Sequence, residues 1–321
     1  MIIRMERANI GFTVPTSISW WRMKQILFNP FDIGKWFVLG FTAWLATLVE
    51  ANTGGGGGGG TGDLSEAGSE PEVEEMFNEG LNWVQDNIEV VFGIGAIIAA
   101  VVVVVVVLLT WVQSRGKLMF LDNVINNRAL VGQPWKEYRS EGNSLFVWTL
   151  LFSFIALLIV GVVGGGWGWM IYKELSANEM EWTGVAIGSG IGFVGFLLLL
   201  GLLFGYVKVL LEDFVVPLMY QRRLSTTDAW HVFLSLHSQY TGRFVLYFFW
   251  YILLNIGWSF AIMAVVLITC CIAGVLMAIP YLGTVLILPM LVFFRALGPT
   301  FLRQFGQDCD LWKGTQLEVQ Q

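Results

Sequence analysis

Residues 90–112 read VVFGIGAIIAAVVVVVVVLLTWV and contain no charged side chain. A helix needs about 20 residues to cross the hydrocarbon core of a bilayer, which is roughly 30 Å thick. A run of valines disfavours a helix in water. In lipid, however, every backbone N–H and C=O must bond within the segment, and a helix satisfies them all. The stretch therefore predicts a membrane-spanning helix.

Five further stretches are long and apolar enough, or nearly so, to cross in the same way. The predicted spans are Ile33–Val49, Val90–Val112, Leu145–Ile171, Gly184–Val209, Phe244 to about Leu276, and about Leu282 to Phe301. The last two share an uncharged stretch, residues 244–294, that is too long for one crossing, and Pro280 and Gly283 offer a turn within it. We expect an all-α, polytopic membrane protein with six transmembrane helices in three hairpins, forming a single membrane domain over residues 1–321.

The composition agrees with this class and excludes others. Of the 321 residues, 56% are hydrophobic and 13% charged, and the mean hydropathy is +0.67. Soluble domains carry about 25% charged residues, so a soluble enzyme with an ordinary polar surface is excluded, as are disorder and coiled coil. The net charge of −6 is no guide to a partner, because the charges are segregated along the chain. We expect membrane lipids as partners and no nucleic acid.

The basic residues are distributed unevenly between the predicted loops. Of the 18 Lys and Arg, all but Lys173 lie before or at the start of the first span, between the second and third, around the fourth-to-fifth connection, or at and after the end of the sixth. Because short cytoplasmic loops collect Lys and Arg, we expect both termini to be cytoplasmic, in the plasma (inner) membrane of a bacterium. Residues 1–32 then form a cytoplasmic interfacial N-terminus, and residues 304–321 form a cytoplasmic tail.

Residues 50–89 form the first non-cytoplasmic loop and have an unusual composition. Seven consecutive glycines, Gly54–Gly60, predict a flexible tether. Between the glycines and residue 89 the chain carries Asp and Glu but no Lys or Arg. Ser69, Pro71 and Glu72 have the spacing of a helix start. Apolar residues then recur at helical spacing. We expect a solvated acidic helix that rests on the bundle; a site for a cation or a basic partner is the alternative.

The three cytoplasmic approaches to the hairpins look alike. Each has tryptophan in a short amphipathic stretch: Trp20 and Trp21 before the first span, Trp135 before the third and Trp230 before the fifth. Tryptophan favours the membrane interface because its ring is apolar and its N–H needs a polar partner. We expect a cytoplasmic interfacial helix at each place; chance similarity among Trp-rich segments is the alternative.

The exits of the hairpins also correspond, each with a basic residue followed five positions later by a polar one. The pairs are Lys117 and Asp122, Lys208 and Asp213, and Arg295 and Thr300. The third pair breaks the pattern, because a hydroxyl stands in the acidic place. Parallel repeats occur in transporters, but a repeat alone does not imply transport.

Ionisable side chains are nearly absent from the predicted spans, which argues against a proton- or sodium-coupled carrier. The candidates for a functional polar site lie mostly at the cytoplasmic mouth of the bundle. They are Asp122, Asn123, Glu212, Asp213, Asn255 and Arg295. Salt bridges to Lys117, Lys208 or Arg222 are the competing interpretation for the carboxylates, and an interhelical hydrogen bond is the competing one for Asn255.

The sequence contains no motif for nucleophilic, metal or nucleotide chemistry. His231 and His237 are six residues apart and face opposite sides of a helix, unlike a zinc pair at i and i+4. Cys270, Cys271 and Cys309 have neither disulfide nor zinc spacing. We expect no catalytic residue, no metal and no cofactor.

Small and helix-breaking residues mark the packing of the spans. Glycines recur at four-residue spacing in the third and fourth spans, for example at Gly161 and Gly165. Such positions let helix backbones approach closely, so we expect the two glycine faces to meet; homodimerisation through them is the alternative. Pro217 and Pro289 should kink or break their helices.

Three stretches carry a resemblance to a known group of proteins. They are Lys24–Asp32 (KQILFNPFD), Ser114–Asn123 (SRGKLMFLDN) and Gly142–Phe146 (GNSLF). These stretches resemble an uncharacterised family of bacterial six-span membrane proteins, which is similar to the membrane domain of some glycerophosphodiester phosphodiesterases. The resemblance implies no catalytic residues, because the phosphodiesterase domain of those fusions has no counterpart in the chain.

The function expected from the residues is non-enzymatic. We expect an integral membrane protein that is structural, interacts with lipid or regulates a partner. A transporter or channel for an apolar or amphipathic solute is the alternative, favoured by the repeat and by Pro289.

Overall fold

The computed structural model describes residues 10–49, 87–177, 184–269 and 272–318, and every element within these ranges is a helix. The helices are α1 (Thr13–Phe28), α2 (Ile33–Thr47), α5 (Ile88–Ile125), α6 (Gly132–Glu137), α7 (Arg139–Ala177), α8 (Gly184–Leu210), the π-helix η1 (Leu211–Val215), α9 (Val216–Arg222), α10 (Thr226–Ile268), α11 (Ile272–Ala278), α12 (Leu282–Leu286), α13 (Leu288–Leu302), and the short 3-10 helices η2 (Arg303–Phe305) and η3 (Gln307–Cys309). The predicted acidic helix, Cys270 and Cys271 lie outside the described residues.

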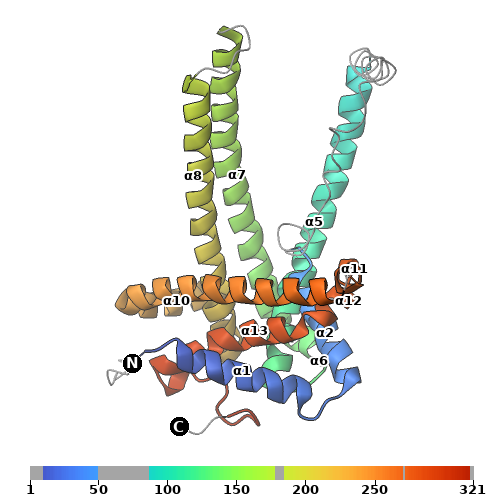
Figure 1. Ribbon diagram of the computed structural model, residues 1–321, viewed down its shortest axis with the longest axis vertical. Helices are drawn as coiled ribbons and strands as arrows, with labels where there is room; N and C mark the ends of the chain where they lie inside the picture. The colour runs from blue at the N-terminus through green and yellow to red at the C-terminus, as the bar shows by residue number, and fades with distance from the viewer. Residues whose placement is uncertain (1–9, 50–86, 178–183, 270–271, 319–321) are drawn as a thin grey trace.

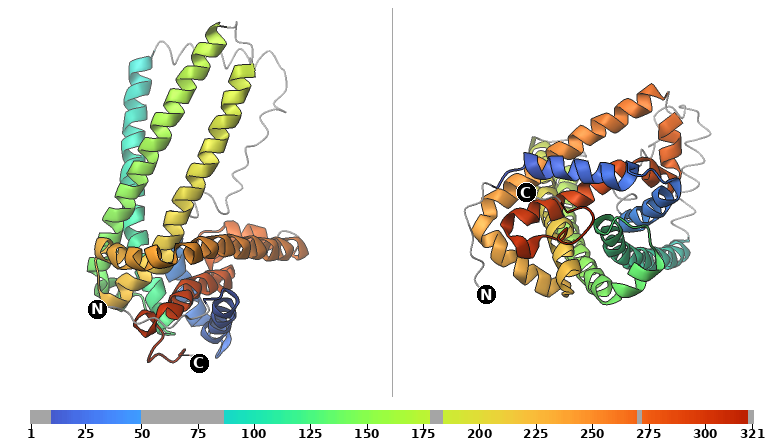
Figure 2. Two further views of the ribbon diagram at one scale, coloured as in Figure 1. Left: turned by 90° about the vertical axis from the view of Figure 1, so that its left-hand side faces the viewer. Right: turned by 90° about the horizontal axis from the view of Figure 1, so that it is seen from below.

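The helices form two parts of different shape. Three long helices, α5, α7 and α8, stand upright, and the shorter helices gather around their lower ends in what we call the base (Figure 1). α10 lies across the upright helices at the top of the base, and α1 and α13 lie below it (Figures 1 and 2). Both described ends of the chain are in the base.

Four helices are long and apolar enough to cross a membrane. They are α5, α7, the continuous run Gly184–Arg222 that begins with α8, and α10, with 38 to 43 residues each. These four coincide with the predicted second to fifth spans, which confirms membrane-length helices at those places. Each extends past its apolar stretch into polar sequence, as α5 does beyond Val112.

The helices at the first and sixth predicted spans are shorter than expected. α2 has 15 residues, beginning where the Asp32 side chain accepts from the N–H groups of Gly34 and Lys35. The sixth stretch is divided at Ile287 into α12 and α13, with Pro289 in the first turn of α13. Proline suits a first turn because the N–H groups of that turn have no acceptor within their own helix, so its missing N–H costs nothing there. The predicted break at Pro289 is confirmed.

The upper part of α5 presents apolar side chains to the surroundings. The valines from Val101 to Val106 are 46–61% exposed, and Phe92 is 73% exposed. A helix that is apolar all round and unburied in its own protein is typical of one surrounded by lipid.

The predicted meeting of glycine faces between α7 and α8 is wrong for most of these glycines. The rings of Trp167 and Phe193 stack at 4.4 Å between the two helices. Gly164 faces Phe193 and Gly190 faces Trp167, but a Cβ on Gly161 or Gly165 of α7, or on Gly188 or Gly192 of α8, would meet nothing within 4 Å. Aromatic side chains therefore hold the helices further apart than glycine packing would.

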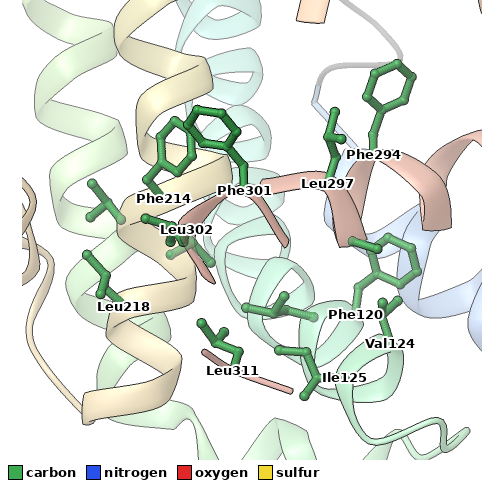
Figure 3. Close-up of a cluster of buried hydrophobic side chains, with 14 of the residues drawn as sticks. Phe120, Val124, Ile125, Phe214, Leu218, Phe294, Leu297, Phe301, Leu302 and Leu311 are labelled. Carbon is green, nitrogen blue, oxygen red and sulfur yellow. The ribbon is translucent and has the colours of Figure 1, made fainter. Parts of the chain in front are cut away.

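The hydrophobic core lies in the base. Phe214 of η1 and Phe301 of α13 lie with centroids 5.9 Å apart, and Val124 and Ile125 of α5 pack in the same cluster (Figure 3). Burying side chains of this size contributes about 1.5–3 kcal/mol each. The core therefore joins the lower ends of the upright helices to α13.

Helices form at the three places where the sequence predicts an interfacial helix with tryptophan. α1 contains Trp20 and Trp21, α6 contains Trp135, and the first part of α10 contains Trp230. Two of them match the prediction as separate short helices. The third is continuous with the predicted fifth span, separated from it only by the non-helical backbone of Tyr240.

We expect Gly298→Ala to destabilise the protein. A Cβ at Gly298 would lie 2.7 Å from the Cα of Asp213, where the backbone cannot move aside, so the cost should be about 1–3 kcal/mol. The measurement is the free energy of unfolding in mixed detergent micelles, with circular dichroism as the signal that reports loss of helix. Gly195→Ala is the matched control, because a Cβ there meets nothing within 4 Å. Equal stabilities for the two variants would contradict this account of the α13–η1 contact.

Candidate functional site

The best-defined polar cluster surrounds Asp122, near the lower end of α5. Its side chain is fully buried. The Arg128 guanidinium donates to both carboxylate oxygens, with Nη2 2.7 Å from Oδ2 and 2.8 Å from Oδ1. Oδ1 also accepts from the hydroxyls of Tyr220 and Tyr138, at 3.0 and 3.3 Å, and from Asn126 Nδ2 at 2.8 Å. Four side chains thus donate to one carboxylate.

The two tyrosines of the cluster come from next to α6 and from α9, and both donate to the same oxygen of Asp122. Tyr138, directly after α6, and Tyr220 of α9 stack with centroids 5.0 Å apart. Arg223 also lies over the ring of Tyr138, with Cζ 4.1 Å from the ring centroid, and pairs with Glu137. Burial, together with the hydrogen bond to Tyr220 and the charge of Asp122, raises the pKa of Tyr138, so its hydroxyl remains a donor at neutral pH. The cluster therefore joins α5, α6 and α9.

Arg128 stays charged in this setting. Partial burial lowers its pKa, but the hydrogen bonds and charge of Asp122 outweigh that effect, so that the pKa is raised overall. A buried carboxylate without such a partner would cost several kcal/mol. The pair is thus a structural ion pair whose two partners depend on each other.

Asn123 has a local structural role. Its Nδ2 donates to the carbonyl of Leu130 at 2.8 Å, and its Oδ1 accepts from the Leu130 N–H at 3.0 Å. Both bonds close the loop between α5 and α6. This loop carries Arg128, so Asn123 positions the partner of Asp122.

Glu212 and Asp213 lie in the π-helix η1, which precedes Pro217. Proline cannot donate to the carbonyl four residues earlier, here that of Asp213. The turn widens instead, and the Val216 N–H bonds to the Leu211 carbonyl five residues before it. The helix is thus locally distorted before Pro217, as predicted, and continues through it to Arg222.

The two carboxylates of η1 have different partners. Glu212 pairs with Lys117 at 2.6 Å, one of the salt bridges that the sequence suggests. Asp213 is buried and accepts from the Tyr247 hydroxyl of α10 at 2.7 Å. Arg295 of α13 donates to the backbone carbonyl of Lys117. These contacts join α5, η1, α10 and α13.

Asn255 lies apart from the other candidates. Its Nδ2 donates to the Tyr251 carbonyl, one turn earlier in α10, at 2.9 Å. The sequence predicts a bond to another helix at this position, whereas the observed bond stays within α10. Five of the six candidate residues thus meet at the base, and Asn255 does not.

The sequence does not single out several residues on which the base depends. Arg22 of α1 is fully buried, donates to Thr300 Oγ1 at 2.6 Å, and lies 3.9 Å from the ring centroid of Trp312. Thr300 stands in the acidic place of the third hairpin exit, so the hydroxyl there serves as the acceptor for Arg22. The sequence signal for Arg128, Tyr138 and Tyr220 is weak because they follow Asp122 by 6, 16 and 98 positions.

This arrangement holds helices together. Within the described ranges no group of three or more His, Cys, Asp or Glu could hold a metal ion. His237 lies against Tyr206, with Nε2 2.8 Å from the hydroxyl, and against the ring of Phe244.

We expect Asp122→Asn to destabilise the protein by about 2–4 kcal/mol, because the amide places an NH2 group, itself a donor, at a fully buried position where the Arg128 guanidinium and the tyrosine hydroxyls all need an acceptor. The measurement is unfolding in mixed micelles. Glu137→Gln is the matched control; its partner Arg223 is 43% exposed, so the loss should be below about 1 kcal/mol. A loss for Asp122→Asn no larger than that of the control would show that the cluster does not stabilise the base.

Comparison with known proteins adds a family but no activity. No curated protein and no solved structure matches the chain. Residues 19–305 match a family of unknown function, DUF7544. The match includes α2 to α13 and the whole polar cluster around Asp122. The chain therefore belongs to the DUF7544 family and is an integral membrane protein of a family whose activity is unknown.

Proposed function

We propose that the protein is a non-enzymatic, lipid-interacting membrane protein whose polar residues hold its base together. The observation that carries this proposal is the complete set of partners around Asp122. A carboxylate that moves protons or binds a substrate needs exchangeable partners, whereas the oxygens of Asp122 are all engaged by the protein's own side chains. Glu212 and Asp213 each have one oxygen engaged, by Lys117 and by the Tyr247 hydroxyl.

The distribution of charge supports an orientation for this protein. Of the described Lys and Arg, only Lys173 belongs to the upper end of an upright helix, and the others belong to the base or the helix portions next to it. We therefore propose that the base faces the cytoplasm, with both termini, in the plasma membrane of a bacterium. The proposed kinship to the membrane domain of glycerophosphodiester phosphodiesterases rests on the sequence resemblance alone.

Connectivity supports one crossing beyond the three upright helices. α2 lies in the base, and α5 begins at the far end of the upright helices. The Gly-rich, acidic residues between them are too polar to cross while exposed to lipid. We propose that Ile33–Val49, the first predicted span, makes this crossing in the bilayer. This departs from the arrangement in the structure, where α2 packs beside the lower end of α5, with Leu45 against Gly116 and Lys35 bonded to Asn127.

The number of crossings then depends on α10. If α10 and α12–α13 cross, the protein has the six spans that the sequence predicts; if α10 lies along the inner face, it has four. We propose four, because α10 lies across the upright helices (Figure 1). An interfacial helix normally needs a polar face. α10 needs none if one side packs on α1 and α13 and its exposed apolar residues, among them Phe249 and Phe260, contact hydrocarbon.

Cysteine labelling tests orientation and crossing number together. In a Cys270→Ser, Cys271→Ser background, an impermeant maleimide is applied to intact and to permeabilised cells. Cys309 can remain, because burial raises the pKa of its thiol and slows its reaction. We expect Gly57→Cys to label in intact cells, and Lys136→Cys and Ile279→Cys to label only after permeabilisation. Labelling of Ile279→Cys in intact cells would establish six crossings, and a cytosolic Gly57 would overturn the orientation.

A flux assay tests the function itself. Purified protein in liposomes should give no saturable flux of an amphipathic dye above protein-free liposomes, because the polar residues at the mouth are occupied by one another. Saturable flux abolished by Asp122→Ala or Asp213→Ala would instead establish a transporter. Variants are compared only after equal reconstitution, measured by density flotation.

A further inference from the structure

A groove of about 580 Å³ runs between α1 and α10. The two helices lie side by side there: the Trp250 indole N–H donates to Thr16 Oγ1 at 3.0 Å, and the rings of Trp20 and Trp258 are 5.9 Å apart. The lining residues come from α1, α10 and α13 and include no charged side chain. They are Thr13, Thr16, Ser17, Trp20, Trp250, Leu253, Leu254, Gly257, Trp258, Ala261 and Phe293.

The shape and chemistry of the groove favour an elongated apolar occupant. The ring of Phe293 lies within 6.3 Å of both Trp20 and Trp258 and closes the floor at that end. The indole N–H of Trp250 is already bonded to Thr16, so this tryptophan offers the groove its ring only. The volume is within the roughly 300–1,000 Å³ range of small-molecule sites, which are mostly apolar with a few polar groups.

One end of the groove carries a positive charge. Lys24 follows Trp20 by one helical turn, and its Nζ lies 5.5 Å from the centroid of that ring. The side chain is exposed and makes no ion pair with a described residue. A free ammonium beside an aromatic groove is complementary to an anionic head group attached to an apolar chain.

The position of the groove agrees with such an occupant. α10 forms the upper border of the base, next to the apolar parts of α5, α7 and α8 (Figures 1 and 2). Leu253, which lines the groove, is 56% exposed, so the groove is open at its side. A lipid chain can therefore enter from the surrounding leaflet.

We propose that this groove binds one acyl chain of an anionic phospholipid, with the lipid phosphate on Lys24. The inference rests on the proposed function, since it names the lipid site of a lipid-interacting protein. Trp20 and Trp258 contact the chain, and Gly257 leaves the space that the chain occupies.

Native mass spectrometry of the full chain, released from nanodiscs of equal phosphatidylglycerol and phosphatidylcholine, tests the proposal. We expect the wild type to retain one phosphatidylglycerol. Gly257→Leu should reduce that retention at least tenfold by filling the groove. Gly192→Leu is the matched control, because a Cβ at either glycine meets nothing within 4 Å and Gly192 lies on upright α8, away from the groove.

Lys24→Gln tests the head-group contact. This variant should still bind the acyl chain but prefer phosphatidylglycerol about fivefold less, as expected for one lysine at an anionic surface.

Equal retention by Gly257→Leu and wild type would overturn the site, as would equal loss in Gly192→Leu. If Gly257→Leu fails to fold, Lys24→Gln still decides: an unchanged preference for phosphatidylglycerol overturns the proposal. Failure of the lipid site and failure of the proposed function are distinguishable. The first is read from lipid retention in mass spectrometry and the second from saturable flux in liposomes, and either result can occur without the other.

Discussion

Inside hydrocarbon a polypeptide has no water to satisfy its backbone N–H and C=O groups, and this constraint governs the upright half of the molecule. Each of α5, α7 and α8 satisfies its own backbone, so it needs few neighbours to remain a helix. Their side chains contact surroundings as apolar as themselves, and association between them gains no hydrophobic free energy. This explains why the stacked rings of Trp167 and Phe193 form a prominent contact between α7 and α8, with most of the glycines beside them left open.

In the base, stability depends on pairing polar side chains, because several helices end there and bury polar groups away from water. Each buried charge must find a partner within the protein or leave a large uncompensated cost. Asp122 finds Arg128 and two tyrosine hydroxyls, and Glu212 finds Lys117. These pairs connect helices that are distant in sequence. The same residues that suggest a functional site in the sequence therefore account for how the base stays together.

α10 connects the two halves. Its first part packs in the base through Phe233, which stacks on Phe214 of η1. After Tyr240 it continues along the border between the base and the apolar helices. Trp20 of α1 and Trp258 of α10 face one another at this border. Tryptophan suits the position because its apolar ring can contact hydrocarbon while its N–H bonds to a polar group. The α1–α10 groove is a consequence of two aromatic helices that lie together without filling the space between them.

Features that depend on one segment of the chain alone could be predicted from the sequence. The all-α class, four membrane-length helices, the helices with tryptophan, the distortion before Pro217 and the break at Pro289 follow from hydropathy, length and the missing N–H of proline, which act within one segment. What only the tertiary structure decided depends on contacts between segments. These include the transverse course of α10, the shorter α2 and α13, and the partner of each carboxylate. Asp122 is paired with Arg128 rather than with Lys117, Lys208 or Arg222 because the Asn123–Leu130 bonds bring the α5–α6 loop back over it, a geometry that no spacing in the sequence encodes.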